Sequence, residues 1–197
     1  GGSLLNTIEF AGRDVQFNAQ VVHTNGTFSF ISTAPMTATF TGLTNDLGNS
    51  VFTNSSGVTH TVVLSDALTS FSQNLTTSAS SQLNFQLDDG INAEITGGDA
   101  TGSNFTTGTN DKGELELKNS DMTINRVGAN SLALNKLTFT ENATVDGDVY
   151  ATNISVADGK TATFGGNVTG TIESANAGNG TLNFTGSSIV SGNVGAS

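Results

Sequence analysis

The chain is 197 residues long, with 24 glycines, one proline, no cysteine, no tryptophan and a formal net charge of −11. Only six residues are Lys or Arg, so nucleic acid is not expected as a partner, because phosphate recognition relies on clustered cations. The absence of cysteine excludes disulfides and thiolate metal sites. Direct insertion into a membrane is not expected either, since no apolar run approaches the roughly 20 residues of a membrane-spanning helix.

The composition favours β-strands joined by turns. Thr, Asn, Ser and Gly dominate the sequence. Thr is β-branched and prefers a pleated surface, whereas Asn and Gly accept the backbone conformations that turns need. The apolar fraction of 35% is low for a thick globular core. It is sufficient for a solenoid, because each rung of a solenoid buries its apolar side chains against the neighbouring rungs.

The N-terminal third, residues 4–64, is predicted to consist of short strands. Apolar residues alternate with polar ones in Ile8-Glu9-Phe10 and Val15-Gln16-Phe17. Turn signals such as Asn25-Gly26 separate these segments. Residues 1–3, Gly-Gly-Ser, are interpreted as a remnant of protein expression, and the chain as a fragment of a longer protein.

Residues 64–75 are predicted to form the one short helix of the chain. Apolar side chains recur there with spacings of four, three and four residues, as on one stripe of a helix, at Leu64, Leu68, Phe71 and Leu75. Ser65 and Asp66 are available as N-caps. Such a helix would lie against the side or the end of a stack of strands.

Strands are predicted again from residue 82 onward. Residues 82–87 and 91–95 alternate apolar and polar side chains, and Asp88-Asp89-Gly90 between them is predicted to form a tight turn. Residues 96–113 are rich in Gly, Thr and Asn, with Phe105 as the one large apolar residue, and are predicted to be the loosest loop. Three more strands are predicted, at residues 114–118, 122–124 and 131–134.

The last third, residues 137–194, repeats one phrase three times: apolar-x-Phe, a short polar turn, then apolar-x-Gly-x-apolar. Its phenylalanines, Phe139, Phe164 and Phe184, are 25 and 20 residues apart. A repeat of about 20–25 residues made of short alternating strands is typical of a β-solenoid. We therefore predict an all-β, right-handed parallel β-helix that spans residues 1–197 as one unit, is most regular over 132–197 and stacks the three phenylalanines inside the coil.

The alternative fold is an antiparallel β-sandwich. The Asn-Gly turns favour it, because such turns are typical of hairpins. The repeat in the last third favours the solenoid instead. No stretch is predicted to be a linker between domains, since the composition hardly changes from one end of the chain to the other.

Asp146 and Asp148 are the strongest candidates for acid–base chemistry. They flank Gly147, so on a strand they would share one face, and polysaccharide-cleaving β-helices use such acid pairs. Val145 and Val149 alternate with them, which makes the aspartates the outward-facing residues of an ordinary strand. Sugar clefts also use Trp and Tyr, whereas this chain has no Trp and one Tyr. We therefore assign no catalytic residue and predict that the chain is not an enzyme.

No metal or cofactor site is predicted. His23 and His60 are the two histidines, and neither has another ligand at a metal-binding spacing, so they are interpreted as surface or strand-end residues. Gly97-Gly98-Asp99 begins like a calcium-binding repeat but does not recur. Asn110-Asp111 lacks the alternating acids and the closing Glu of a calcium hand.

The repeats resemble the passenger region of bacterial autotransporters, and more narrowly the rickettsial surface cell antigens and outer membrane protein B. The resemblance rests on residues 160–170 (KTATFGGNVTG), 178–184 (GNGTLNF) and 187–194 (SSIVSGNV), and it covers residues 132–197 most firmly. It implies a passenger displayed outside the cell, on the bacterial surface, by an outer-membrane β-barrel. It also implies a role in attachment to host cells. The catalytic motifs of the family members that are proteases or esterases are absent from this chain.

Three functions are consistent with this sequence. The first is an adhesive or structural module that binds a host cell-surface protein through an extended lateral face. The second is a polysaccharide-binding or polysaccharide-cleaving β-helix, which would depend on Asp146 and Asp148. The third is a passive spacer that holds another domain away from the membrane.

Overall fold

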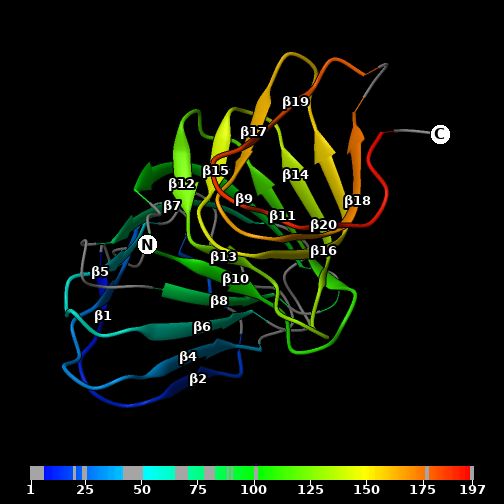
Figure 1. Ribbon diagram of the computed structural model, residues 1–197. Coiled ribbons are helices and arrows are strands. Elements are labelled where there is room, and N and C mark those ends of the chain that lie inside the picture. Colours follow the sequence, from blue (N-terminus) through cyan, green and yellow to red (C-terminus); the bar gives the residue numbers. More distant parts are fainter. Residues whose placement is uncertain are drawn as a thin grey trace.

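The chain folds into a right-handed parallel β-helix, as the repeat predicts. A computed structural model describes residues 7–19, 21–23, 26–41, 51–64, 71–77, 83–87, 89, 91–99, 102–175 and 178–195. Within these ranges it contains twenty strands and no helix (Figure 1). The pairings between the named strands are all parallel, so the alternative of an antiparallel sandwich is wrong.

Two long faces run along the solenoid. The first face contains β1 (Thr7–Phe10), β3 (Thr27–Phe30), β5 (Val51–Asn54), β7 (Phe71–Thr77), β9 (Asn92–Asp99), β11 (Lys112–Leu117), β14 (Leu134–Phe139) and the later parts of β16 (Val149–Val156) and β18 (Val168–Ser174). The second face contains β2 (Val15–Phe17), β4 (Thr37–Phe40), β6 (His60–Leu64), β8 (Leu83–Leu87), β10 (Asn104–Thr106), β13 (Arg126–Val127), the first residues of β16 and β18, and β20 (Val190–Ser191).

A third face closes the C-terminal half of the solenoid. It consists of β12 (Met122–Ile124), β15 (Ala143–Val145), β17 (Thr161–Phe164) and β19 (Thr181–Phe184), which lie side by side in Figure 1. The first two faces join in this half, because β16 and β18 each bend and contribute to both. Gly170, with φ of 148°, lies at the bend of β18.

The rungs vary in length. Partners in adjacent rungs are 24 residues apart at Thr27 and Val51 but only 17 apart at Leu137 and Ile154. Inward-facing residues nevertheless stay aligned, because parallel strands in register keep the same alternation. One apolar column of the second face therefore continues through Val127, Val149, Val168 and Val190.

Phenylalanine rings fill the N-terminal half of the core. Phe28 and Phe52 stack with centroids 4.8 Å apart, and Phe85 and Phe105 stack at 5.3 Å. All four rings are fully buried. Burial of each ring stabilises the fold by about 1.5–3 kcal/mol, so a chain of low apolar content can still form a closed core.

An asparagine ladder runs along the second face. The Asn104 side-chain amide donates to Asn84 Oδ1 at 2.6 Å, and the Asn125 amide donates to Asn104 Oδ1 at 2.7 Å. Asn104 is buried, so these bonds satisfy a polar side chain that would otherwise lose its contacts with water. The ladder ties three successive rungs together.

The helix predicted for residues 64–75 is wrong. Leu64 is the last residue of β6, Phe71 is the first residue of β7, and Leu75 lies in register with Phe52 of β5. Residues 65–70 lie outside the described residues. Pairing of β7 with β5 and β9 gives its backbone hydrogen bonds on both sides, and this outweighs a helical spacing in a segment rich in Ser and Thr.

The long loop predicted for residues 96–113 is also wrong. β9 continues to Asp99, β10 begins at Asn104 and β11 begins at Lys112. Phe105 is fully buried and lies in register with Phe85. Few residues of this Gly- and Thr-rich segment favour a buried strand by themselves. Backbone hydrogen bonds to the neighbouring rungs hold it in the extended conformation.

The predicted equivalence of the three C-terminal phenylalanines holds for one pair. Phe164 and Phe184 are in register on the third face, with centroids 5.6 Å apart. Phe139 instead lies on the first face, in register with Val156. Its ring still meets Phe164 edge-on at 5.5 Å, so Phe139 and Phe164 pack together in the core without belonging to one column. Phe184 is 38% exposed, so the prediction that all three rings lie inside the coil is wrong for Phe184.

Candidate functional site

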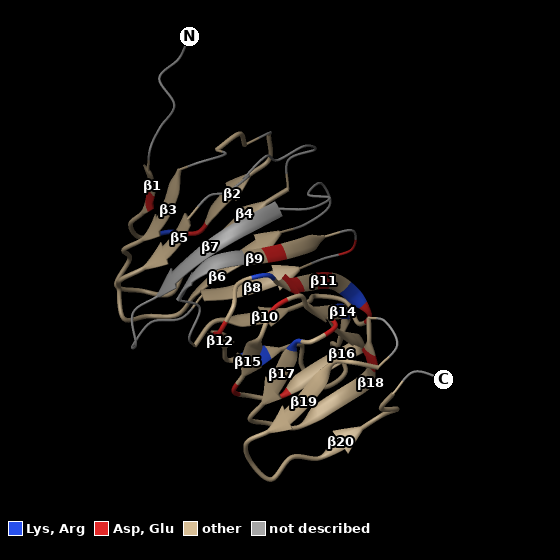
Figure 2. Ribbon diagram, turned by 90° about the horizontal axis from the view of Figure 1, so that it is seen from above, with Lys and Arg blue, Asp and Glu red and all other residues tan. Residues whose placement is uncertain are grey.

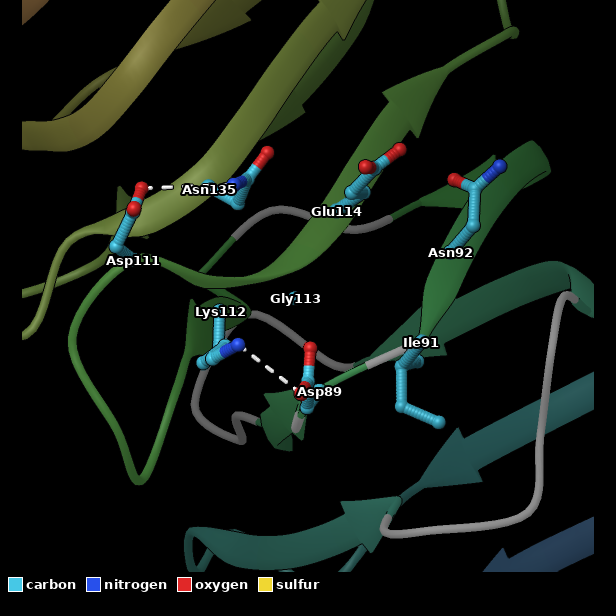
Figure 3. Close-up of a pocket in the computed structure, with 8 residues that line it drawn as sticks. All are labelled: Asp89, Ile91, Asn92, Asp111, Lys112, Gly113, Glu114 and Asn135. Atoms are coloured by element: carbon cyan, nitrogen blue, oxygen red, sulfur yellow. Dashed lines mark hydrogen bonds and ion pairs between the residues drawn. The ribbon is translucent and has the colours of Figure 1, made fainter.

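A polar groove on the first face is the main candidate site among the described residues. It has a volume of about 310 Å³ and lies where β9, β11 and β14 begin (Figure 3). Eight residues line it: Asp89, Ile91, Asn92, Asp111, Lys112, Gly113, Glu114 and Asn135. They come from three successive rungs, so the groove exists only once the solenoid is wound.

Tight backbone turns shape the groove. Asp111 and Gly113 have φ of 61° and 72°, in the left-handed region that favours Gly, Asn and Asp. The Asp111 amide donates to the Ala133 carbonyl at 2.8 Å, and the Ala133 amide donates to Asn110 Oδ1 at 2.8 Å. These two bonds tie the turn before β11 to the turn before β14, and thereby fix the spacing of the groove's walls.

The groove carries an excess of negative charge. Lys112 Nζ lies 3.0 Å from Asp89 Oδ2, and the side-chain amide of Asn135 donates to Asp111 Oδ1 at 3.5 Å (Figure 3). Glu114 is in register between Asn92 and Lys136. The lining therefore has three carboxylates and two side-chain amides against one ammonium group. Such a lining suits a ligand rich in hydrogen-bond donors and positive charge.

A second cluster of charges continues the groove along the same face. Glu94 and Glu116 are directly in register, an arrangement of like charges that is unfavourable by itself. Lys118 Nζ lies 3.0 Å from Glu94 Oε2 and 3.6 Å from Glu116 Oε2. The hydrogen bond to Glu94, followed by the charge of Glu116, raises the pKa of Lys118 above its usual value. Lys118 thus neutralises a pair of stacked carboxylates.

We call these residues together the charged patch: Asp89, Glu94, Asp111, Lys112, Glu114, Glu116, Lys118 and Lys136. Figure 2 shows this concentration of charge on β9, β11 and the neighbouring segments. Sequence reasoning did not identify the patch, although a signal was present. In Lys112 to Lys118, Leu115 and Leu117 alternate with charged residues, which places the charges on the outer face of the strand.

Asp146 and Asp148 do not lie on a strand, contrary to the prediction. They occupy the corner between β15 and β16, with Asp146 exposed. Asp148 Oδ1 accepts a hydrogen bond from the backbone N–H of Asn167 in the next rung at 2.8 Å. Asn167 Oδ1 in turn accepts a hydrogen bond from the backbone N–H of Ile189, one rung further on, at 3.0 Å. Asp148 therefore has a structural role, as a side-chain acceptor for a backbone N–H group.

The two histidines are buried, so neither is a surface residue, but His60 lies at a strand end, which was the other interpretation. His23 is 6% exposed and packs against Phe28, while His60, the first residue of β6, is fully buried. His60 Nε2 lies 2.7 Å from Ser56 Oγ, which is also 2.9 Å from Asn54 Oδ1. A nucleophilic serine needs a histidine oriented by a third group, and His60 Nδ1 has no hydrogen-bond partner among the described residues. The hydrogen bonds among Asn54, Ser56 and His60 therefore stabilise the turn before β6.

Burial of His60 predicts a pH-dependent stability. Burial lowers the pKa of His60 below the 6.5 of a free histidine. The unfolded chain then binds more protons than the folded chain between these two pKa values, so stability falls as the pH drops below about 6.5, by up to ~1.4 kcal/mol per pH unit. Urea unfolding at pH 7.5 and pH 5.0 should show a larger loss for the wild type than for His60→Gln. Equal losses in both proteins would contradict this prediction.

The Gly97-Gly98-Asp99 segment does not form a calcium-binding turn. Gly97, Gly98 and Asp99 belong to β9 and are in register with Asn74, Leu75 and Thr76 of β7. Asp88 lies outside the described residues, while Asp89 and Asp111 line the groove. Within the described ranges, no group of three or more His, Asp or Glu side chains is arranged to hold a metal ion. The same ranges contain no helix long and apolar enough to cross a membrane.

Comparison with known proteins yields no match to a protein-family model, to a curated protein or to a solved structure.

Proposed function

We propose that the chain is a segment of a surface-displayed autotransporter passenger, and that it attaches to a host cell-surface protein through the charged patch on its lateral face. The observation that carries the proposal is the patch itself. Charged residues make up only 12% of the sequence, yet eight of them gather on β9, β11, β14 and the adjoining turns. The resemblance of residues 160–194 to autotransporter passengers supplies the surface setting.

The geometry of a solenoid supports a lateral binding face. Stacked rungs form a long surface whose strands are held on both sides, so a partner meets a preorganised array of side chains. Charge complementarity then contributes to specificity and to the rate of association. Because carboxylates outnumber ammonium groups in the groove, the partner should present basic side chains there.

The test is binding of the purified chain, coated on beads, to cultured host cells. Asp89→Asn, Asp111→Asn and Glu114→Gln together remove three negative charges from the groove and keep the side-chain shapes. The control variant, Glu9→Gln with Asp146→Asn and Asp158→Asn, removes three exposed carboxylates elsewhere. We expect the groove variant to bind at least about tenfold less, equivalent to ~1.4 kcal/mol, and the control to bind like the wild type.

Three results would contradict the proposal. Wild-type beads that do not bind cells would favour a passive spacer. Equal losses in the groove variant and the control would indicate a nonspecific effect of charge, and full binding by the groove variant would place adhesion on another face.

A further inference from the structure

His60 is a titratable side chain inside an uncharged part of the coil. It is the first residue of β6 and is 0% exposed. β6 pairs with β4 and β8, beside which it lies in Figure 1, and the His60 ring stacks on Phe30 of β3 at 5.3 Å. None of β3, β4, β5, β6 and β8, nor the turn at residues 54–59, contains an Asp, Glu, Lys or Arg. A charge on the ring would therefore have no counter-ion on the elements that surround it.

The charged groups of the neighbouring rungs lie outside the core. In the described part of the chain before β7, they are Glu9 on β1, with Arg13 and Asp14 before β2, and all three are exposed. The other histidine, His23, is buried and tilts against an aromatic ring of β3, with ring centroids 4.6 Å apart. None of these groups places an anion in the core beside His60.

The hydrogen bonds of His60 suit a neutral ring and leave a charged ring incomplete. An imidazolium has an N–H group on both nitrogens. Nε2 has an acceptor, because Ser56 Oγ lies 2.7 Å away, whereas Nδ1 is buried without a hydrogen-bond partner among the described residues. The face of Phe30 attracts a cation but provides neither an acceptor nor a negative charge. Protonation of the folded ring therefore creates a buried, unpaired donor on a cation, which strongly favours any conformation that admits water.

The turn before β6 is fastened to the same ring. Asn54 Nδ2 donates to the Val58 carbonyl at 2.8 Å, and Ser56 Oγ lies 2.9 Å from Asn54 Oδ1 as well as next to His60 Nε2. Hydration of the charged ring requires this turn or the neighbouring strands to move away from β6. Proton uptake and opening are thereby coupled.

The rungs around His60 are less supported than those of the C-terminal half. β3, β4, β5 and β6 are four or five residues long, whereas β14, β16 and β18 are six to eight. The third face begins only at β12, and no histidine follows His60 in the sequence. Each rung of a solenoid contacts only its neighbours, so one part can open while another stays folded.

We propose that the rungs of β3, β4, β5 and β6 form an acid-sensitive switch, which opens when His60 takes up a proton while the C-terminal rungs remain wound. Opening exposes the stacked rings of Phe28 and Phe52, which are fully buried in the closed form. The chain then presents an apolar surface only at acidic pH. The charged patch lies on other rungs, so the switch does not depend on the attachment proposed above.

Hydrogen exchange of the wild type, followed by mass spectrometry at pH 7.5 and pH 5.0, tests this inference. Exchange is corrected for its intrinsic rate at each pH and then reports the opening equilibrium of each segment. One proton taken up on opening changes this equilibrium by up to about tenfold per pH unit. Peptides from β3 to β6 should therefore lose at least about tenfold in protection at pH 5.0, and peptides from β14 to β17 should keep theirs. Equal losses in both halves, or no loss in either, would overturn the inference.

Two substitutions identify the group that takes up the proton. His60→Gln has a side chain that does not titrate, and should abolish the difference between the two halves. His23→Gln, the matched control, replaces the other buried histidine and should retain the difference. If His60→Gln is unfolded by far-UV circular dichroism at pH 7.5, a nuclear magnetic resonance titration of wild-type His60 decides, because its ring should protonate in step with the loss of protection. A wild-type response in folded His60→Gln, or protonation without loss of protection, would overturn the inference; neither result bears on binding through the charged patch.

Discussion

Replacing Phe105 with alanine should lower the free energy of unfolding by about 3–5 kcal/mol. The ring is fully buried, stacks on Phe85 at 5.3 Å and lies in register with Phe85 and Val127 on either side. Its removal would leave a cavity that neighbouring rungs cannot fill, because their backbone hydrogen bonds fix the strand spacing. Urea unfolding followed by far-UV circular dichroism would measure the loss.

Phe184→Ala is the matched control. Phe184 also stacks on a phenylalanine, Phe164, at 5.6 Å, but it lies on β19, which pairs with β17 on one side, and is 38% exposed. We expect it to cost less than about 2 kcal/mol, because less apolar area is removed and no closed cavity forms. If the two variants lost the same stability, the buried stack would not be the main support of the central rungs.

The alternation of apolar and polar residues predicted most of the strands correctly. Leu83, Phe85 and Leu87 face inward on β8, as the sequence pattern indicates. Such local patterns are reliable because a strand has a side-chain period of two whatever its partner. Combined with the repeat, they also predicted the parallel β-helix.

The predictions of secondary structure failed for two segments whose conformation is determined by the neighbouring rungs. A helical spacing at residues 64–75 and the many glycines at 96–113 are local features. Parallel pairing of β7 with β5 and β9, and of β10 with β8 and β13, overrides them. The partners lie 20 or more residues away, so no property of the segment itself predicts this pairing.

The groove could not be predicted for a related reason. Asn92 and Glu114 are neighbours because β9 and β11 pair with an offset of 22 residues in sequence. Lys112 and Leu134 pair between β11 and β14 with the same offset. Elsewhere the offset falls to 17 or rises to 24. Alternation placed the charges of β11 on the outside, but only the register of adjacent rungs determines which charges share a site.

Replacing a single glycine in the groove should lower the free energy of unfolding nearly as much as replacing the buried Phe105. Gly113 has φ of 72°, and a Cβ at this position would lie 2.5 Å from the Leu87 carbonyl oxygen. We expect Gly113→Ala to cost about 2–4 kcal/mol, because the strain of a left-handed alanine, ~1–2 kcal/mol, adds to the displacement of β8 or β11. The loss can be measured by urea unfolding.

Gly159→Ala separates the two contributions. Gly159 has nearly the same φ, 70°, but a Cβ there would have no atom within 4 Å, so only the left-handed strain of about 1–2 kcal/mol remains. The difference between the variants measures the close approach of the rungs at Leu87. Because Gly113 also lines the groove, Gly113→Ala should weaken cell binding while Gly159→Ala should not. Equal effects of the two substitutions on stability would mean that the turn can move away from Leu87 at little cost.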